Sequence, residues 1–206
     1  MDENATAVTR KRYGRTARFY DLMQLFSERR SGPWRDRLWK MASGPRILEV
    51  GVGTGLNIPR YPEDAEITAI DLTPGMLDRA LRKAQALKRK IDLRLGDVQR
   101  LEYPDGAFDT VVATCVFCSV PDARLGLTEV KRVARPGGKV LLLEHQRARS
   151  ERVGKIMDLL NPFMVRMMGA NINRRTVDNV RAAGLEIDRV EDLDKLGIFK
   201  LIIAHA

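Results

Sequence analysis

The stretch Arg46-Ile-Leu-Glu-Val-Gly-Val-Gly-Thr-Gly-Leu-Asn57 decides the fold of this chain. A short apolar run ends in Glu49 and in three glycines at alternate positions. A second apolar run, Ile67-Thr-Ala-Ile-Asp71, ends in an acid 20 residues after Gly51. This layout is typical of the nucleoside-binding first half of an α/β sheet. The glycines let the backbone approach a ligand closely, and the acid at the end of the second strand accepts hydrogen bonds from ribose hydroxyls.

The glycine spacing narrows the class of ligand. Gly51, Gly53 and Gly55 form Gly-x-Gly-x-Gly, which differs from the Gly-x-Gly-x-x-Gly of dinucleotide-binding folds. No basic residue follows in the P-loop pattern, so a nucleoside triphosphate is disfavoured. Glu49, close before the first glycine, also disfavours a phosphate there. It favours a cationic ligand, such as the α-amino group or the sulfonium of S-adenosylmethionine.

The chain resembles the class I S-adenosylmethionine-dependent methyltransferases over residues 45–145. Besides the glycine-rich stretch, the resemblance rests on four motifs in the family's order: Asp71-Leu-Thr-Pro-Gly-Met76, Leu95-Gly-Asp-Val98, Phe108-Asp-Thr-Val-Val-Ala-Thr114 and Arg135-Pro-Gly-Gly-Lys-Val-Leu-Leu-Leu143. The resemblance implies a Rossmann-like α/β fold. We expect a seven-stranded, mostly parallel sheet with helices on both faces and additional N-terminal helices.

The resemblance also assigns roles to residues. Glu49, the three glycines and Thr114 are expected to hold the methionine part of S-adenosylmethionine, and Asp71 the ribose. Asp97 is expected to receive the adenine amino group. The full set of expected cofactor-binding residues is Tyr20, Glu49, Gly51, Gly53, Gly55, Asn57, Asp71, Leu72, Met76, Asp97, Val98 and Thr114. S-adenosyl-L-homocysteine is the expected product.

Three further side chains are candidates for the chemistry of methyl transfer. Tyr13 and Tyr20 share one helical face, where an aromatic ring near a sulfonium or a quaternary ammonium gains about 0.5 to 2 kcal/mol of cation–π energy. Ordinary helix packing explains the pair equally well. His145 follows the fifth strand at the expected catalytic edge, where it accepts the substrate's proton or has only a structural role. We predict that His145 and Tyr20 are catalytic residues.

Charge and composition limit the partners. The chain of 206 residues carries a formal net charge of +9, and residues 10–40 contain ten basic and three acidic side chains. A segregated basic stretch with interleaved apolar residues suits an anionic membrane surface, although a solvated helical face is the simpler reading. The N-terminus lacks the pattern of a signal peptide, and no apolar run approaches the ~20 residues of a spanning helix. We expect a cytoplasmic protein attached peripherally to the inner face of the membrane.

Cys115 and Cys118 form a Cys-x-x-Cys motif at the end of the fourth predicted strand. Zinc would need two more ligands, and the chain has only two histidines. We therefore expect no metal, and we interpret both cysteines as small core residues near the cofactor.

Periodicity predicts the remaining elements. We expect two helices in residues 5–40, separated by Ser31-Gly-Pro33, then five alternating strands and helices. Helices are expected at residues 73–87 and 123–134, the latter stopped by Pro136-Gly-Gly138. Asn173 is expected to cap a helix at residues 174–183. The last two strands are expected at residues 185–190 and 198–204.

Residues 1–42 are expected to form an N-terminal amphipathic region and residues 43–206 the cofactor-binding domain. Within it, residues 146–172 are expected to form a substrate-side lid. The segment 153–170 is rich in methionine and other apolar residues, which is most often a sign of core packing. Methionine also adapts to variable apolar partners, so a cover for a greasy substrate is an alternative.

The chain is also similar to bacterial phosphatidylethanolamine N-methyltransferases of the Rhodobacter type. This similarity rests on Phe117-Cys-Ser-Val-Pro121, Leu143-Glu-His145, Leu159-Leu-Asn-Pro162, Gly169-Ala-Asn-Ile-Asn-Arg-Arg-Thr176 and Gly197-Ile-Phe-Lys-Leu-Ile-Ile203. It implies an enzyme that converts phosphatidylethanolamine to phosphatidylcholine through monomethyl and dimethyl intermediates on an anionic membrane. We separately expect the chain to be a monomer. Methylation of a quinone ring or a small alkyl thiol remains an alternative. A basic nucleic-acid-binding module is a weaker one, since no nucleic-acid motif is present.

Overall fold

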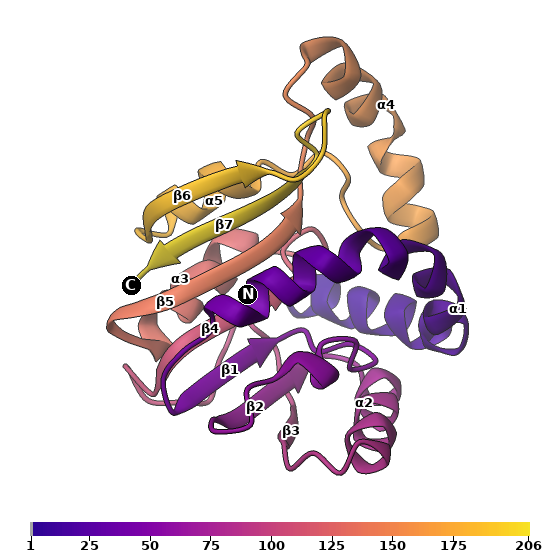
Figure 1. Cartoon of the computed structure of the whole chain (residues 1–206). Helices are drawn as coiled ribbons and strands as arrows, with labels where there is room; N and C mark the ends of the chain where they lie inside the picture. The colour runs from indigo at the N-terminus through magenta and orange to yellow at the C-terminus, as the bar shows by residue number, and fades with distance from the viewer. Residues whose placement is uncertain (1) are drawn as a thin grey trace.

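The chain folds around one seven-stranded sheet in the order β3-β2-β1-β4-β5-β7-β6 (Figure 1). This computed structural model describes residues 2–206, and of residues 15–28 and Met168 it describes the backbone alone. The strands are β1 (Arg46–Val50), β2 (Glu66–Asp71), β3 (Asp92–Leu95), β4 (Phe108–Thr114), β5 (Ala134–His145), β6 (Glu186–Asp192) and β7 (Phe199–His205). Only β7 runs antiparallel to its neighbours, so the predicted mostly parallel sheet is confirmed.

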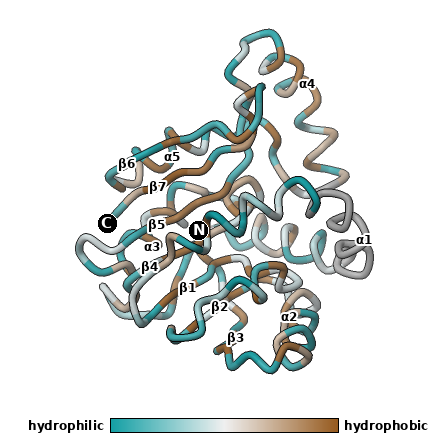
Figure 2. Tube along the Cα trace, viewed as in Figure 1, coloured by the Kyte–Doolittle hydropathy of each residue, from teal (hydrophilic) through white to brown (hydrophobic). Residues whose placement is uncertain are grey.

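Helices cover both faces of the sheet. They are α1 (Glu3–Met41), α2 (Pro74–Ala86), α3 (Ala123–Val133), α4 (Glu151–Met168) and α5 (Thr176–Ala182), with the short 3-10 helix η1 (Ile58–Arg60). One buried cluster joins the sheet to α3 and α5, and the other joins it to α2 and to the end of α1. Hydrophobic runs follow strands such as β5 and β7 (Figure 2), because strands buried on both faces read as continuous apolar runs.

The N-terminal prediction was wrong in one respect, because α1 continues through Pro33 instead of breaking there. An interior proline costs a helix about 3 kcal/mol relative to alanine. The following turn buries Leu38 and Trp39 completely or nearly so against the sheet. Burial of a large apolar side chain contributes about 1.5 to 3 kcal/mol, so two of them offset the proline.

Two other boundaries differ from the prediction. Asn173 does not cap α5, which begins at Thr176; its amide donates instead to Asp158 Oδ1 of α4 at 3.0 Å. The segment Pro136-Gly-Gly138 was expected to end the preceding helix, but α3 already ends at Val133 and the segment belongs to β5. There the register with β4 shifts between Phe108 and Thr110, so the glycines form an irregular start of the strand.

The helix α4 projects away from the sheet beyond the end of β5 (Figure 1). Hydrophobic positions nevertheless recur along it (Figure 2). Arg147 fastens its first turns through ion pairs with Glu151 at 2.9 Å and Asp158 at 3.1 Å. The sequence predicted a connection without sheet structure here, and the structure shows an 18-residue helix.

Candidate functional site

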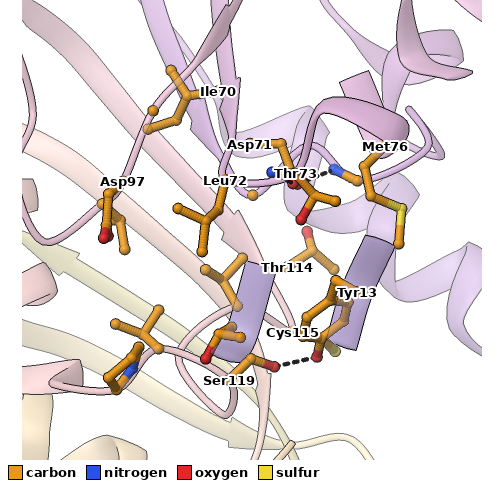
Figure 3. A pocket seen from close by; sticks show the side chains of 18 residues that line it. Tyr13, Ile70, Asp71, Leu72, Thr73, Met76, Asp97, Thr114, Cys115 and Ser119 are labelled. Carbon is orange, nitrogen blue, oxygen red and sulfur yellow. Dashed lines mark hydrogen bonds between the residues drawn. The ribbon is translucent and has the colours of Figure 1, made fainter. Parts of the chain in front are cut away.

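A cavity opens at the carboxyl ends of β1 to β4, where the strand order reverses. Such a switch point is where open α/β sheets bind their ligands. The lining consists of Thr9, Tyr13, Gly51, Gly53, Ile70, Asp71, Leu72, Thr73, Met76, Gly96, Asp97, Val98, Thr114, Cys115, Val116, Ser119, Val120 and Pro121. Figure 3 shows Asp71 and Asp97 on the side of the strand ends, with Tyr13 and Ser119 in contact across from them.

Asp71 stands at the end of β2 with its carboxylate held by two backbone amides. Gly53 N–H donates to Oδ2 and Thr73 N–H donates to Oδ1, both at 2.9 Å. Burial raises the pKa of Asp71, and the two amides act against this by stabilising the ionised form. Each carboxylate oxygen keeps a further lone pair, so the group can still accept hydrogen bonds from two neighbouring hydroxyls.

Asp97 occupies the corresponding place after β3. Its Oδ1 accepts from the Gln99 backbone amide at 2.9 Å, and the Gln99 side-chain amide donates to both carboxylate oxygens. The Thr6 hydroxyl of α1 lies 3.3 Å from Oδ2. The first turns of α1 therefore lie directly against the acid that was predicted to contact adenine.

The three glycines of the first turn have different tasks. Gly53 has a φ of +56°, and a Cβ there would meet no atom within 4 Å, so it borders open space in the cavity. A Cβ on Gly51 would lie 2.4 Å from the Val116 side chain. On Gly55 it would lie 2.5 Å from Ile58, and Gly55 is absent from the cavity lining. Gly53 thus provides the close backbone approach, whereas Gly55 allows packing against η1 and α2.

Glu49 lies behind the cavity and is 1% exposed. Asn57 Nδ2 donates to Oε1 at 2.5 Å, and the Tyr61 hydroxyl donates to Oε2. Arg35 of α1 in turn donates to Asn57 Oδ1 at 2.9 Å. Burial raises the pKa of Glu49 to about 7, against the lowering effect of these donors.

The predicted pair Glu49 and Asn57 is therefore brought together, but neither residue lines the cavity. Their link to it is Thr114, whose hydroxyl accepts from Asn57 Nδ2 at 3.1 Å and which does line the cavity. A direct role of Glu49 and Asn57 in binding remains a prediction.

Tyr13 closes the cavity from the side of α1. Its hydroxyl forms a hydrogen bond with the Ser119 hydroxyl after β4 (Figure 3). The two residues are 106 positions apart in sequence, so this contact joins the N-terminal helix to the cavity wall. The side chain of Tyr20, the other aromatic candidate, lies outside the described residues.

His145 ends β5 beside the cavity wall but does not belong to the lining. Its ring meets Phe199 edge-on at a centroid distance of 6.2 Å. Burial lowers the pKa of His145, so the imidazole is neutral at neutral pH and can accept a proton. Its catalytic role stays a prediction.

Both cysteines are free thiols, and Cys115 lines the cavity whereas Cys118 is not among its lining residues. Burial raises the pKa of Cys115 to about 12 and also raises the pKa of Cys118. Both thiols are therefore protonated at neutral pH, which makes them weak nucleophiles.

Cys115, which the sequence predicted to lie near the cofactor, does line the cavity. The sequence did not assign a role to several other lining residues, chiefly Gly96, Val116 and Ser119. A usable signal existed, because Gly96 precedes Asp97 and the other two follow β4 at the same edge of the sheet. Thr9 of the lining and Thr6, which contacts Asp97, carried no such signal, since their positions depend on how α1 packs.

The lining fits a nucleoside joined to a short polar chain. Asp71 and Asp97 offer acceptors at the ends of adjacent strands, and Ile70, Leu72 and Met76 offer apolar surface between them. Gly53 leaves room for a ligand against the backbone. Among the residues that the structure describes, the lining offers acids and apolar groups and no lysine of the phosphate-binding-loop kind.

Comparisons with known proteins agree with this site. A methyltransferase domain family matches residues 48–142. The phosphatidylethanolamine N-methyltransferase of Cereibacter sphaeroides is 42% identical over 106 residues, covering 50% of this chain and 52% of that relative. A thiol S-methyltransferase of Homo sapiens is 38% identical over 104 residues, covering 48% and 42%.

A longer match comes from the demethylmenaquinone methyltransferase of Lactobacillus johnsonii, which is 30% identical over 209 aligned residues, covering 93% of this chain and 84% of that relative. The crystal structure of an S-adenosylmethionine-dependent methyltransferase from Methanosarcina mazei superposes with a TM-score of 0.64 at 23% identity, covering 80% of this chain and 93% of that one. This chain spans about half the length of the Cereibacter relative.

Proposed function

Because the chain belongs to the class I S-adenosylmethionine-dependent methyltransferases, we propose that it methylates the amine of phosphatidylethanolamine at a membrane surface. The cofactor, S-adenosylmethionine, supplies an electrophilic methyl group on its sulfonium. The described residues would hold it through Asp71 at the ribose and Asp97 at the adenine. The protein's own contributions are orientation, exclusion of water and removal of the amine's proton.

One observation carries the choice of a lipid acceptor, namely the exposed apolar face of α4. Five large apolar side chains recur at helical spacing on it: Ile156 (57% exposed), Leu159 (80%), Leu160 (47%), Phe163 (61%) and Met167 (56%). Soluble proteins rarely leave contiguous apolar patches in water unless they bind a partner or a membrane.

The charges around this face favour an anionic membrane. Glu151 and Asp158 of α4 are paired with Arg147, whereas Arg152, Lys155 and Arg166 are exposed. A helix with an apolar face and exposed basic residues lies in the headgroup region of a bilayer. Each basic side chain near an anionic surface adds roughly 1 kcal/mol. No helix in the part of the chain that the structure describes has the length and hydropathy to cross a bilayer.

The helix α4, which carries the apolar face, is connected to the loop of the cavity wall by hydrogen bonds. Asn161 of α4 donates to Asn171 Oδ1 at 3.2 Å, and Asn171 donates to the Cys118 carbonyl at 2.9 Å from its backbone and 3.1 Å from its side chain. A lipid held on α4 would therefore lie next to the loop that lines the cofactor cavity. This arrangement supports the lid expected at residues 146–172.

We propose His145 as the residue that receives the proton of the acceptor amine, directly or through water. The amine must be neutral to attack, and the lowered pKa of His145 leaves its imidazole uncharged at neutral pH, with a lone pair free to receive a proton. His145→Ala should slow methyl transfer while leaving cofactor affinity unchanged. Equal activity of the variant would return His145 to a structural role beside Phe199.

The deciding experiment supplies labelled S-adenosylmethionine and vesicles of phosphatidylethanolamine and phosphatidylglycerol, with the lipid products resolved chromatographically. Labelled monomethyl, dimethyl and choline lipids are the expected products, and Asp71→Ala is the inactive control. Parallel reactions contain demethylmenaquinone or an alkyl thiol, the acceptors suggested by the other relatives. Labelling of either one with no labelled lipid would refute the phospholipid assignment.

Flotation with anionic vesicles tests the docking surface separately. Leu159→Ser together with Phe163→Ser should reduce binding, because both side chains belong to the exposed face of α4. Leu81→Ser is the matched control, since Leu81 is 47% exposed on α2. Removal of residues 1–30 tests how much of the vesicle binding depends on the basic N-terminal region. Binding to RNA in place of vesicles would support the nucleic-acid alternative.

A further inference from the structure

The loop that follows β4 forms one wall of the cofactor cavity in an unfavourable backbone conformation. Cys115 opens it with a φ of +54°, a region that residues other than glycine rarely adopt. Residues in such conformations persist when their surroundings hold them there. The lining residues of this loop are Cys115, Val116, Ser119, Val120 and Pro121.

Glu144, on the neighbouring strand β5, accepts hydrogen bonds from the backbone amides of this loop. Its side chain is fully buried, and its Oε1 accepts from Val116 N–H at 2.7 Å and from Phe117 N–H at 3.1 Å. The Cys118 amide also stabilises the ionised carboxylate. Successive backbone amides that face one anion form a nest, in which an anion is bound by the backbone alone. Here the anion belongs to the protein itself.

Burying a carboxylate costs free energy unless hydrogen-bond donors surround it. The Glu144 carboxylate therefore keeps the loop amides close to it, and the amides keep the carboxylate in place. Burial raises the pKa of Glu144 to about 7 even with these donors. The titratable groups that act on or respond to it are the Cys115 and Cys118 thiols, both protonated at neutral pH.

The loop in turn sets the width of the cavity near the glycine turn. The Val116 side chain lies so close to Gly51 that a Cβ on Gly51 would be 2.4 Å from it. Both residues line the cavity, whereas Glu144 does not. A displacement of the Val116 amide therefore changes the shape of the cofactor site without any direct contact from Glu144.

We propose that Glu144 is a positioning residue, whose carboxylate fills the backbone nest of residues 116–118 and thereby fixes Cys115 and Val116 in the wall of the cofactor cavity. It acts through the loop and touches neither cofactor nor acceptor. The inference needs only cofactor binding and is independent of which acceptor is methylated.

The rest of the loop has separate anchors, so loss of Glu144 should act locally. Asn171 donates twice to the Cys118 carbonyl, and Arg174 donates to the Val120 carbonyl at 2.8 Å. In variants at position 144, the end of the loop around Cys118 and Val120 should therefore keep its position.

The test measures the affinity of the full chain for S-adenosylmethionine and for S-adenosylhomocysteine by calorimetry, without any acceptor. Glu144→Met keeps the volume and removes the acceptor. It should weaken both ligands by about tenfold, because a loop that has lost a hydrogen bond to a charged group leaves its binding conformation in most molecules. Glu144→Gln retains an amide oxygen for Val116 and Phe117, so its affinities should return to within a few-fold of the parent chain.

Glu144→Asp keeps the charge but withdraws it by one methylene, and it should weaken both ligands even if Glu144→Met does not fold. Leu142→Ala, on the same strand, is the control for lost stability and should lower the melting temperature with unchanged affinity. Unchanged affinity in the Met or Asp variant would overturn the proposal. Loss of S-adenosylmethionine binding alone would also overturn it, because the carboxylate would then act by charge on the sulfonium.

Discussion

Replacement of Glu49 by glutamine tests whether this acid belongs to a buried network or to the cofactor site. Its carboxylate accepts from Asn57 and Tyr61 and is nearly inaccessible to water. Glutamine has the same shape and keeps one acceptor oxygen, but it has no charge to bury. The substitution removes the ionisation of this position, and its new amide nitrogen can donate to the Tyr61 hydroxyl once that hydroxyl rotates.

The magnitude follows from the pKa. Burial raises the pKa of Glu49 from 4.5 in the unfolded chain to about 7 in the folded one, so the folded state binds the proton more tightly between these values. Stability must then fall as pH rises through this window, and the fall is complete above pH 7. At 1.36 kcal/mol for each pKa unit, the loss is about 3 kcal/mol.

Urea unfolding from pH 4.5 to 8 measures this loss in the parent chain and in Glu49→Gln. We subtract the free energy of unfolding of the parent chain from that of the variant at each pH. This difference should increase by about 3 kcal/mol between pH 4.5 and pH 8. Glu144, whose pKa is also raised to about 7, contributes equally to both proteins and cancels in the difference.

Parallel stability curves from pH 4.5 to 8 would refute the reasoning, because Glu49 would then titrate as it does in the unfolded chain. Cofactor affinity at pH 8 gives a second readout. A role within the network leaves the affinity of Glu49→Gln within a few-fold, whereas direct contact with the cationic methionine part predicts a loss of about tenfold or more.

Two other predictions concern the cavity lining. Asp71→Ala should weaken S-adenosylmethionine by about 10² to 10⁴-fold in calorimetry, because two hydrogen bonds to a charged group contribute about 1.5 to 3 kcal/mol each; unchanged affinity would remove Asp71 from the site. Tyr13→Phe should weaken the cofactor by about 2- to 10-fold through loss of one neutral hydrogen bond, and Ser119→Ala should match it, since each variant removes the same contact. A clear difference between these two variants would mean that Tyr13 acts on the cofactor directly.

Local sequence patterns sufficed for the sheet and for the edge that carries the site. Strands β1 and β2 end where apolar runs give way to Glu49-Val-Gly51 and Asp71, and the structure places Gly51, Gly53, Asp71 and Asp97 in one cavity. These features could be predicted because strand burial and glycine turns are encoded by residues a few positions apart.

The partners of the polar side chains were decided by tertiary structure alone. Glu49 faces Asn57 and Tyr61 instead of the cavity, and Tyr13 meets Ser119 from 106 positions away. The continuation of α1 through Pro33 likewise depends on the burial of Leu38 and Trp39 against the sheet. The alternation of strands and helices could be predicted because apolar periodicity involves residues that are close together in the sequence. The direction in which a buried acid points was not readable, because it depends on which distant donor the packing brings beside it.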